Sequence, residues 1–282
     1  MTGSHCSVLN IINKVSAFSD RAQPGGWNDL DMLEVGNGGM TDDEVRCCLK
    51  QWKGSMLNFE LQYKAHFSMW AALKSPLLIG TDIRKLSSAT LTILNNPAVI
   101  AISQDPLGRS IAQVRRDTDG LKKDKYGMGE TQVWSGHLSG GDEVVVLFNA
   151  ADEDVEMTAS LEEIFYADGP EGSAEAVHKE WEVYDLWANR MDSATAQKIL
   201  DAGETIEASE KLFQGANWYN ATALSYQDGL KANDPRLLGK FVGIIQPRGV
   251  LKFMVKRHSA EMFRLRSSGG EARRYISVRD EL

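Results

Sequence analysis

The chain of 282 residues lacks the signals that identify several common kinds of site. Its three cysteines are an odd number without CxxC spacing, so they indicate neither a zinc site nor a disulfide framework. The five histidines show no metal-ligand spacing, and the sequence has no GxxxxGK[ST] loop to hold phosphates. The sequence therefore predicts no metal and no cofactor.

Long apolar runs and an excess of positive charge are absent too. No run approaches the roughly 20 apolar residues of a membrane-spanning helix, which argues against a membrane role. The net charge of −8 argues against a nucleic-acid partner, because phosphate binding needs clustered lysine and arginine. The N-terminus has neither the basic segment nor the apolar segment of a signal peptide, so we do not interpret it as one. The remaining composition, 43% hydrophobic and 25% charged, is typical of a soluble globular protein of unspecified oligomeric state.

The most informative stretch is GGWNDLDMLEVGNGGM at positions 25–40. If Trp27 to Val35 is an extended strand, Asp29 and Asp31 point to the same side, with Cα atoms roughly 7 Å apart. Both would then face one ligand, and sugar sites use carboxylates to accept hydrogen bonds from hydroxyls. The alternative is a simple turn in which Asx side chains bind their own backbone.

The first 108 residues alternate helical and extended patterns. Three helices are expected: Ser7 to Ala22, one that begins with a capping box at Thr41 to Glu44 and continues through Tyr63 to Leu73, and Ser87 to Asn95. Two strands and one buried run are expected between and after them: Trp27 to Val35, Pro76 to Ile83, and Val99 to Ser103. Such alternation is typical of a parallel sheet.

After Gly108 the pattern changes to short β-rich runs separated by Gly, Ser and Asp turns. The clearest runs are Gln132 to Trp134, Glu143 to Phe148, and Val155 to Ala159. Their spacing predicts an antiparallel β-sandwich. The tryptophans of this part are interpreted as core residues rather than as carbohydrate platforms: Trp134, Trp181, Trp187 and Trp218.

Three sequence blocks follow one another in an order known from one enzyme family: GGWNDLDMLEVGNGGMTDDE (25–44), AHFSMWAALKSPLLIGTDI (65–83) and ILNNPAVIAISQDPLG (93–108). Together with segments at 134–136, 161–165 and 184–190, they resemble the α-galactosidases, or melibiases, of glycoside hydrolase family 27. The likeness is to the fungal, yeast-melibiase-like branch and runs from about His5 to Arg266. It implies the C-terminal part of a (β/α)8 TIM barrel in 1–108, an antiparallel β-sandwich domain in 109–266, and a divergent tail in 267–282.

The resemblance also implies an activity and a set of site residues. The family hydrolyses terminal, non-reducing α-D-galactose from oligosaccharides such as melibiose, with retention and without a cofactor. Asp31 and Met32 fall at galactose-pocket positions, whereas Asp29 and Trp27 match the motif and are expected mainly to hold the loop.

The catalytic residues of the family have no counterpart in this chain. The family's nucleophile lies in a Tyr-Asp-(Asn/Gly)-Cys motif that does not occur in the sequence, and its acid/base segment would precede His5. Asp29 and Asp31 make a poor substitute pair, because neighbours on one strand face do not flank a sugar. We therefore assign no catalytic residue and expect this chain to be inactive. The alternative is a non-catalytic remnant that binds galactose weakly.

One insertion interrupts the resemblance, from Val45 to Gln62. We interpret it as an intron left in the translated gene, because Val codons begin with GT and Gln codons can end with AG. The alternative is a genuine surface insertion, which loops tolerate well. The final Arg279-Asp280-Glu281-Leu282 differs by one residue from an ER-retention signal and is taken as a coincidence.

The resemblance carries further expectations about processing and folding. The family is secreted, and the one N-glycosylation sequon, at Asn220, would be used on that route. Cys6 matches a family half-cystine whose partner would lie upstream; a buried free thiol is the alternative. Two barrel strands without neighbours would expose an edge that pairs with other chains, so we expect poor solubility or partial disorder there. The β-sandwich domain is the part expected to fold alone.

Overall fold

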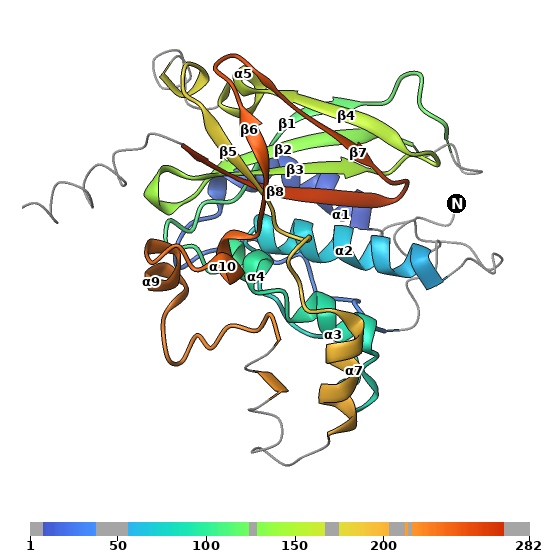
Figure 1. Cartoon of the computed structure of the whole chain (residues 1–282). Coiled ribbons are helices and arrows are strands. Elements are labelled where there is room, and N and C mark those ends of the chain that lie inside the picture. Colours follow the sequence, from blue (N-terminus) through green and yellow to red (C-terminus); the bar gives the residue numbers. More distant parts are fainter. Residues whose placement is uncertain are drawn as a thin grey trace, which may run out of the picture.

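The computed structural model describes residues 8–37, 56–123, 129–166, 175–202, 212–213 and 216–267 (Figure 1). Its helical elements are α1 (Val8–Val15), η1 (Ser16–Arg21), α2 (Met56–Ala72), η2 (Ile83–Lys85), α3 (Ser88–Leu94), α4 (Pro97–Ser103), η3 (Ser139–Gly141), α5 (Leu161–Ile164), α7 (Ser193–Asp201), α9 (Tyr226–Lys231) and α10 (Pro235–Leu238). Its strands are β1 (Ala112–Asp117), β2 (Thr131–His137), β3 (Glu143–Asn149), β4 (Val155–Ser160), β5 (Trp181–Asp185), β6 (Lys240–Ile245), β7 (Val250–Val255) and β8 (Ser259–Ser267). The three cysteines, the capping box of Thr41 and Glu44, and the tail from 268 onward lie outside the described residues.

The strands form two antiparallel sheets. One has six strands in the order β1-β2-β3-β8-β5-β6, and the other pairs β4 with β7. Strands β2, β3 and β4 coincide with the three β-rich runs read from the sequence. The prediction of an antiparallel β-sandwich in this part of the chain is confirmed.

Strand β3, inside the larger sheet, is covered on both faces. Its sequence EVVVLFN is buried at every position. Val145 and Leu147 belong to one apolar cluster together with residues of β4 and β7. Val144, Val146 and Phe148 belong to a second cluster together with residues of α1 and α2. Because side chains alternate along a strand, the uninterrupted apolar run from Val144 to Phe148 is what burial on both faces requires.

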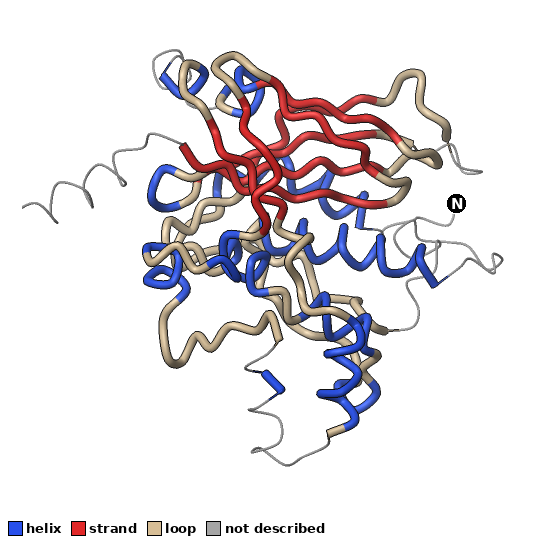
Figure 2. The backbone as a smooth tube through the Cα atoms, viewed as in Figure 1, coloured by secondary structure: helices blue, strands red, loops and turns tan. Residues whose placement is uncertain are grey.

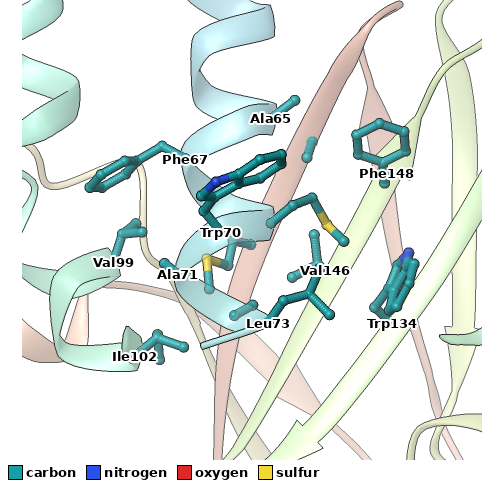
Figure 3. Packing of buried hydrophobic residues seen from close by; sticks show 14 of the residues in the cluster. Ala65, Phe67, Trp70, Ala71, Leu73, Val99, Ile102, Trp134, Val146 and Phe148 are labelled. Carbon is teal, nitrogen blue, oxygen red and sulfur yellow. The ribbon is translucent and has the colours of Figure 1, made fainter. Parts of the chain in front are cut away.

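Helix α2 fills the layer beneath the second face. Figure 3 shows it between the strands that carry Trp134, Val146 and Phe148 and the helix that carries Val99 and Ile102. Helices gather on this side of the strands (Figure 2). The structure therefore has three layers, a two-stranded sheet, a six-stranded sheet and helices, and the helices share a hydrophobic core with the larger sheet.

The two strands expected in the first part are reduced to one parallel bridge between Leu33 and Ile79. The N–H of Leu33 donates to the carbonyl of Leu78 at 2.8 Å, and the N–H of Gly80 donates to the carbonyl of Leu33 at 3.0 Å. Continuous strands at Trp27 to Val35 and at Pro76 to Ile83 are thus a wrong prediction. The backbone leaves the extended region at Asp31, whose φ is +76°, and helix η2 begins at Ile83.

The helices expected in the first part are present with changed limits. The helix read at Ser7 to Ala22 is α1, and it continues as the 3-10 helix η1. The helix read at Ser87 to Asn95 is α3, with Ser87 as its N-cap. The buried run from Val99 to Ser103 belongs to helix α4. Helix α2 begins at Met56, inside the segment interpreted as an insertion.

Asn96 joins the helical layer to the β-sandwich and gives a first test. It is fully buried; its Oδ1 accepts the N–H of Ala98 at 3.1 Å, and its Nδ2 donates to the carbonyl of Leu186 at 2.9 Å. Asn96→Ala removes the N-cap of α4 and leaves the buried carbonyl of Leu186 without its hydrogen-bond donor. We expect the free energy of unfolding, measured in urea, to fall by about 2–4 kcal/mol.

Asp192→Ala is the matched control for that variant. Asp192 caps α7 through the N–H of Thr195 at 2.9 Å, but it lies at the surface, and in the described residues both of its carboxylate oxygens bind Thr195 of the same helix. We expect Asp192→Ala to lower the free energy of unfolding by clearly less than Asn96→Ala does. Equal losses in the two variants would show that the bond to Leu186 contributes nothing.

Candidate functional site

The loop that carries Asp29 and Asp31 is fixed by hydrogen bonds to η1 and to Gly108, which follows α4. Gln23 and Gly26 close a turn through two backbone hydrogen bonds of 3.0 and 2.9 Å. The indole N–H of Trp27 donates to the carbonyl of Gly108 at 3.3 Å, and Asn28 Nδ2 donates to the carbonyl of Phe18 at 3.0 Å. Through its bond to Gly108, Trp27 ties the start of the loop to the residues after α4.

Asp29 and Asp31 both bind the backbone of their own loop. Asp29 Oδ1 accepts the N–H of Asp31 at 2.9 Å, and Asp31 Oδ1 accepts the N–H of Met32 at 2.7 Å. Asp31 tolerates its positive φ because a short polar side chain can bond locally. The prediction that strand alternation turns both carboxylates to one side fails with the strand itself. The observed bonds are those of the Asx-turn alternative.

Trp70 of α2 supports the loop from below. Its Nε1 donates to the carbonyl of Asp31 at 2.8 Å, and the N–H of Leu30 donates to Ser75 Oγ at 3.0 Å. Trp70 and Ser75 are both buried. The sequence analysis did not assign either residue to the site. The sequence holds only a weak indication that Trp70 supports the loop. A buried indole N–H needs a hydrogen-bond acceptor, but the sequence does not identify that acceptor.

The outer side of the loop is exposed. The carboxylates of Asp29 and Asp31 face solvent, and Met32 is 49% exposed. Leu78, Ile79 and Ile83 follow in the second segment of the parallel bridge and are 51 to 66% exposed. A carboxylate thus lies beside apolar side chains on a surface whose backbone is held by the Leu33–Ile79 bridge.

His66 packs behind Trp70 rather than acting in the site. Their rings stack with centroids 4.0 Å apart and planes 19° apart. Its ring nitrogens are buried without a hydrogen-bond partner in the described structure. Burial lowers the pKa of His66 to about 3, so the imidazole is neutral at pH 7.

Two surface cavities lie elsewhere in the described structure. One, of about 500 Å³, is lined by residues of α2, β8 and the segment after β5. The other, of about 610 Å³, lies between residues of β1 and β4. Neither lining includes Trp27, Asp29, Asp31 or Met32. In the described ranges, no group of three His, Cys, Asp or Glu is placed to hold a metal, and no helix is long and apolar enough to cross a membrane.

Two family models match successive parts of this chain. The model described as "Alpha galactosidase A" matches residues 1–105, and "Alpha galactosidase C-terminal beta sandwich domain" matches residues 128–208. The chain combines part of a TIM barrel with an antiparallel β-sandwich, so the fold class predicted from the sequence is confirmed.

Known relatives agree along nearly the whole chain. The α-galactosidase of Torulaspora delbrueckii is 45% identical over 265 residues, which are 94% of this chain and 50% of that protein. The solved α-galactosidase of Saccharomyces cerevisiae is 40% identical, with a TM-score of 0.79 over 94% of this chain and 52% of the other; a raffinose complex from that yeast gives the same values. The chain is therefore a homologue of the yeast α-galactosidases, and the resemblance read from its motifs is confirmed. It spans about half the length of these relatives.

The structure also gives the exposure of the four tryptophans and of the glycosylation sequon. Trp134, Trp181 and Trp187 are buried, as core residues should be, and Trp218 is half-buried. Asn220 is exposed, and its Oδ1 accepts the N–H of Thr222 at 3.0 Å.

The buried stack of His66 predicts a pH dependence of stability. The unfolded chain takes up a proton near pH 6.5, whereas the folded chain does so only near pH 3. The contribution of neutral His66 is therefore complete above pH 6.5 and is lost as the pH falls toward 3. From pH 6 to 4, we expect the free energy of unfolding of the unmodified chain to fall more steeply than that of His66→Phe, by up to about 1.4 kcal/mol per pH unit.

Urea unfolding followed by tryptophan fluorescence measures both slopes. His178→Gln is the control, because His178 lies at the surface beside Arg248. It should keep the steep slope of the unmodified chain. A His66→Phe slope equal to that of the unmodified chain would contradict the shifted pKa.

Proposed function

We propose that residues 1–108 are the last part of an α-galactosidase barrel and that the Asp31 loop supplies one wall of its galactose pocket. In this proposal Asp31 accepts hydrogen bonds from galactose hydroxyls and Met32 packs on the sugar ring. Asp29 and Trp27 hold the loop. The observation that carries the proposal is the exposed carboxylate of Asp31, whose backbone is fixed by Trp70.

The geometry of Asp31 suits sugar binding. One carboxylate oxygen is occupied by the N–H of Met32, which sets the direction of the other. That second oxygen has no hydrogen bond in the described structure and faces solvent. Hydrogen bonds from hydroxyls to an ionised carboxylate are stronger than neutral ones. Because the loop is anchored before the ligand arrives, little ordering is needed on binding.

The reaction proposed for the longer protein is retaining hydrolysis of terminal, non-reducing α-D-galactose from galacto-oligosaccharides such as melibiose. Retention requires two carboxyl groups about 5–5.5 Å apart on opposite sides of the scissile bond. Asp29 and Asp31 come from one loop, and each already binds a backbone N–H. We therefore assign no catalytic residue here and propose that the 282 residues alone are inactive, with the nucleophile and acid/base supplied by further barrel strands.

A second candidate function is that of a non-catalytic remnant that binds galactose weakly. It is favoured by the fact that the Asp31 loop is formed and anchored within this chain. It shares the pocket of the first proposal and differs only in the absence of turnover.

The proposed domain limits are residues 1–108 for the barrel part, 109–266 for the non-catalytic β domain and 267–282 for a divergent tail. We propose that Val45 to Gln62 is absent from the working enzyme. Without it, Thr41 to Glu44 would lead directly into Tyr63 and supply the first turn of α2, in place of the turns that now begin at Met56. Secretion is proposed as for the family, with Asn220 exposed for glycosylation.

Release of p-nitrophenol from p-nitrophenyl α-D-galactoside tests the assignment. Two proteins are compared: the 282-residue chain, and a longer one that restores the remaining barrel strands and omits Val45 to Gln62. We expect turnover in the longer protein alone, because only it would hold both carboxyl groups. Turnover by the 282-residue chain would overturn the assignment of no catalytic residue.

Asparagine substitutions in the longer protein separate the two aspartates. Asp31→Asn and Asp29→Asn both keep an oxygen for the backbone N–H, so each loop stays formed. We expect Asp31→Asn to lower kcat/KM by about 10–100-fold, because a charge-assisted bond to the sugar is lost. Asp29→Asn should change it by less than about threefold. The reverse order would assign the sugar contact to Asp29.

A further inference from the structure

A second polar site lies at the junction of the two parts of the chain. A cavity of about 500 Å³ opens where α2, β8 and residues 185–193 meet. Figure 1 shows this segment as the coil that leads from β5 to α7 across α2. The volume is in the range of small-molecule sites. No residue of the Asp31 loop lines it.

The cationic groups of this cavity are positioned by Trp187. Lys64 Nζ lies 5.3 Å and Arg190 Cζ 5.8 Å from the centre of its ring, within the range of cation–π attraction. Trp187 is itself anchored, because its Nε1 donates to Ser68 Oγ at 2.9 Å. Both cationic heads are therefore held in place before any ligand arrives.

Arg190 has an unused donor. Its Nη2 pairs with Glu60, but its Nη1 is buried and has no hydrogen-bond partner in the described structure. A buried guanidinium N–H without an acceptor is unfavourable. Arg190 lines the cavity and its side chain is 23% exposed, so the accessible part of the guanidinium can donate to a ligand oxygen there.

Of the three acidic groups that line the cavity, Asp192 uses both oxygens on Thr195, whereas Asp185 and Glu261 are partly free. Asp185 binds the N–H groups of Trp187 and Ala188 through Oδ1 alone, at 2.8 and 3.1 Å. Glu261 lies 3.6 Å from Lys64 Nζ, a long ion pair. Burial raises the pKa of Glu261, and the charge of Lys64 opposes that rise. The cavity thus offers fixed acceptors next to fixed donors.

We propose that this cavity binds a neutral polyhydroxylated ligand, namely one hexose unit, with Arg190 and Lys64 as donors and Asp185 and Glu261 as acceptors. A hydroxyl both donates and accepts, so it pairs with groups of either charge. An anion would meet Asp185 and Glu261, and a cation would meet Lys64 and Arg190. The site does not depend on the galactose pocket at Asp31.

Saturation-transfer NMR with D-galactose on the full 282-residue chain tests the proposal. Ala188 lines the cavity and is exposed, and only its backbone N–H bonds to Asp185. Ala188→Phe therefore fills the space without breaking an ion pair. We expect it to weaken galactose binding by at least about tenfold. Arg190→Met, which removes the donor, should do the same, whereas Asp31→Asn should leave this binding unchanged.

Each other outcome has a definite meaning. Binding lost in Asp31→Asn but kept in Ala188→Phe would overturn this site and support the galactose pocket of the proposed function. Absence of saturable binding in the unmodified chain would overturn it outright. Inorganic phosphate that displaces galactose and binds more tightly would replace the neutral ligand by an anion and overturn the stated chemistry. Circular dichroism and urea midpoints check that both cavity variants fold.

Discussion

The burial of helix α2 is the constraint on which the rest of the structure depends. The helix packs between the six-stranded sheet and α4, and Phe67 and Trp70 on α2 and Leu73 directly after it are all at most 1% exposed. Burial of a large apolar side chain contributes about 1.5–3 kcal/mol, so such a helix stabilises both of its neighbours. The same helix holds Asp31 through Trp70 and Trp187 through Ser68. The candidate pocket and the junction cavity are therefore built on one element.

This arrangement explains why the two parts of the chain are not independent bodies. Val144, Val146 and Phe148 on β3 turn their side chains away from the small sheet, and α1 and α2 cover them. A β-sandwich cut off near residue 109 would expose this apolar face to water, a liability for any soluble fold. In the first part of the chain, by contrast, Met32 and Ile79 are about half exposed.

The sequence predicted individual helices and strands well where a single residue pattern determined them. Short β-rich runs between turn residues located β2, β3 and β4, and the helix expected from Ser87 to Asn95 is α3. It failed at Asp31, where local Asx bonding and a positive φ overrode the strand pattern. The motif resemblance assigned Asp31 and Met32 to galactose-pocket positions, but it gave no sign that Trp70 supports their loop.

Long-range features were beyond prediction from single segments. The run EVVVLFN fits a strand buried on both faces, but the identity of the covering layers depends on residues far along the chain. The junction cavity brings together Lys64, Arg190 and Glu261. In the sequence, Lys64 lies more than a hundred residues before the other two. No spacing rule connects such positions, because their proximity follows from how α2 docks on β8.

Native-state hydrogen exchange of the 282-residue chain tests the shared core most directly. If α2 and the sheet form one cooperative unit, the α2 amides from Gln62 to Ala72 should open with the same free energy as those of Val146 on β3 and Met262 on β8. Exchange of α2 well before the two strands would contradict the account. It would show a β-sandwich that folds by itself with the helix only loosely attached.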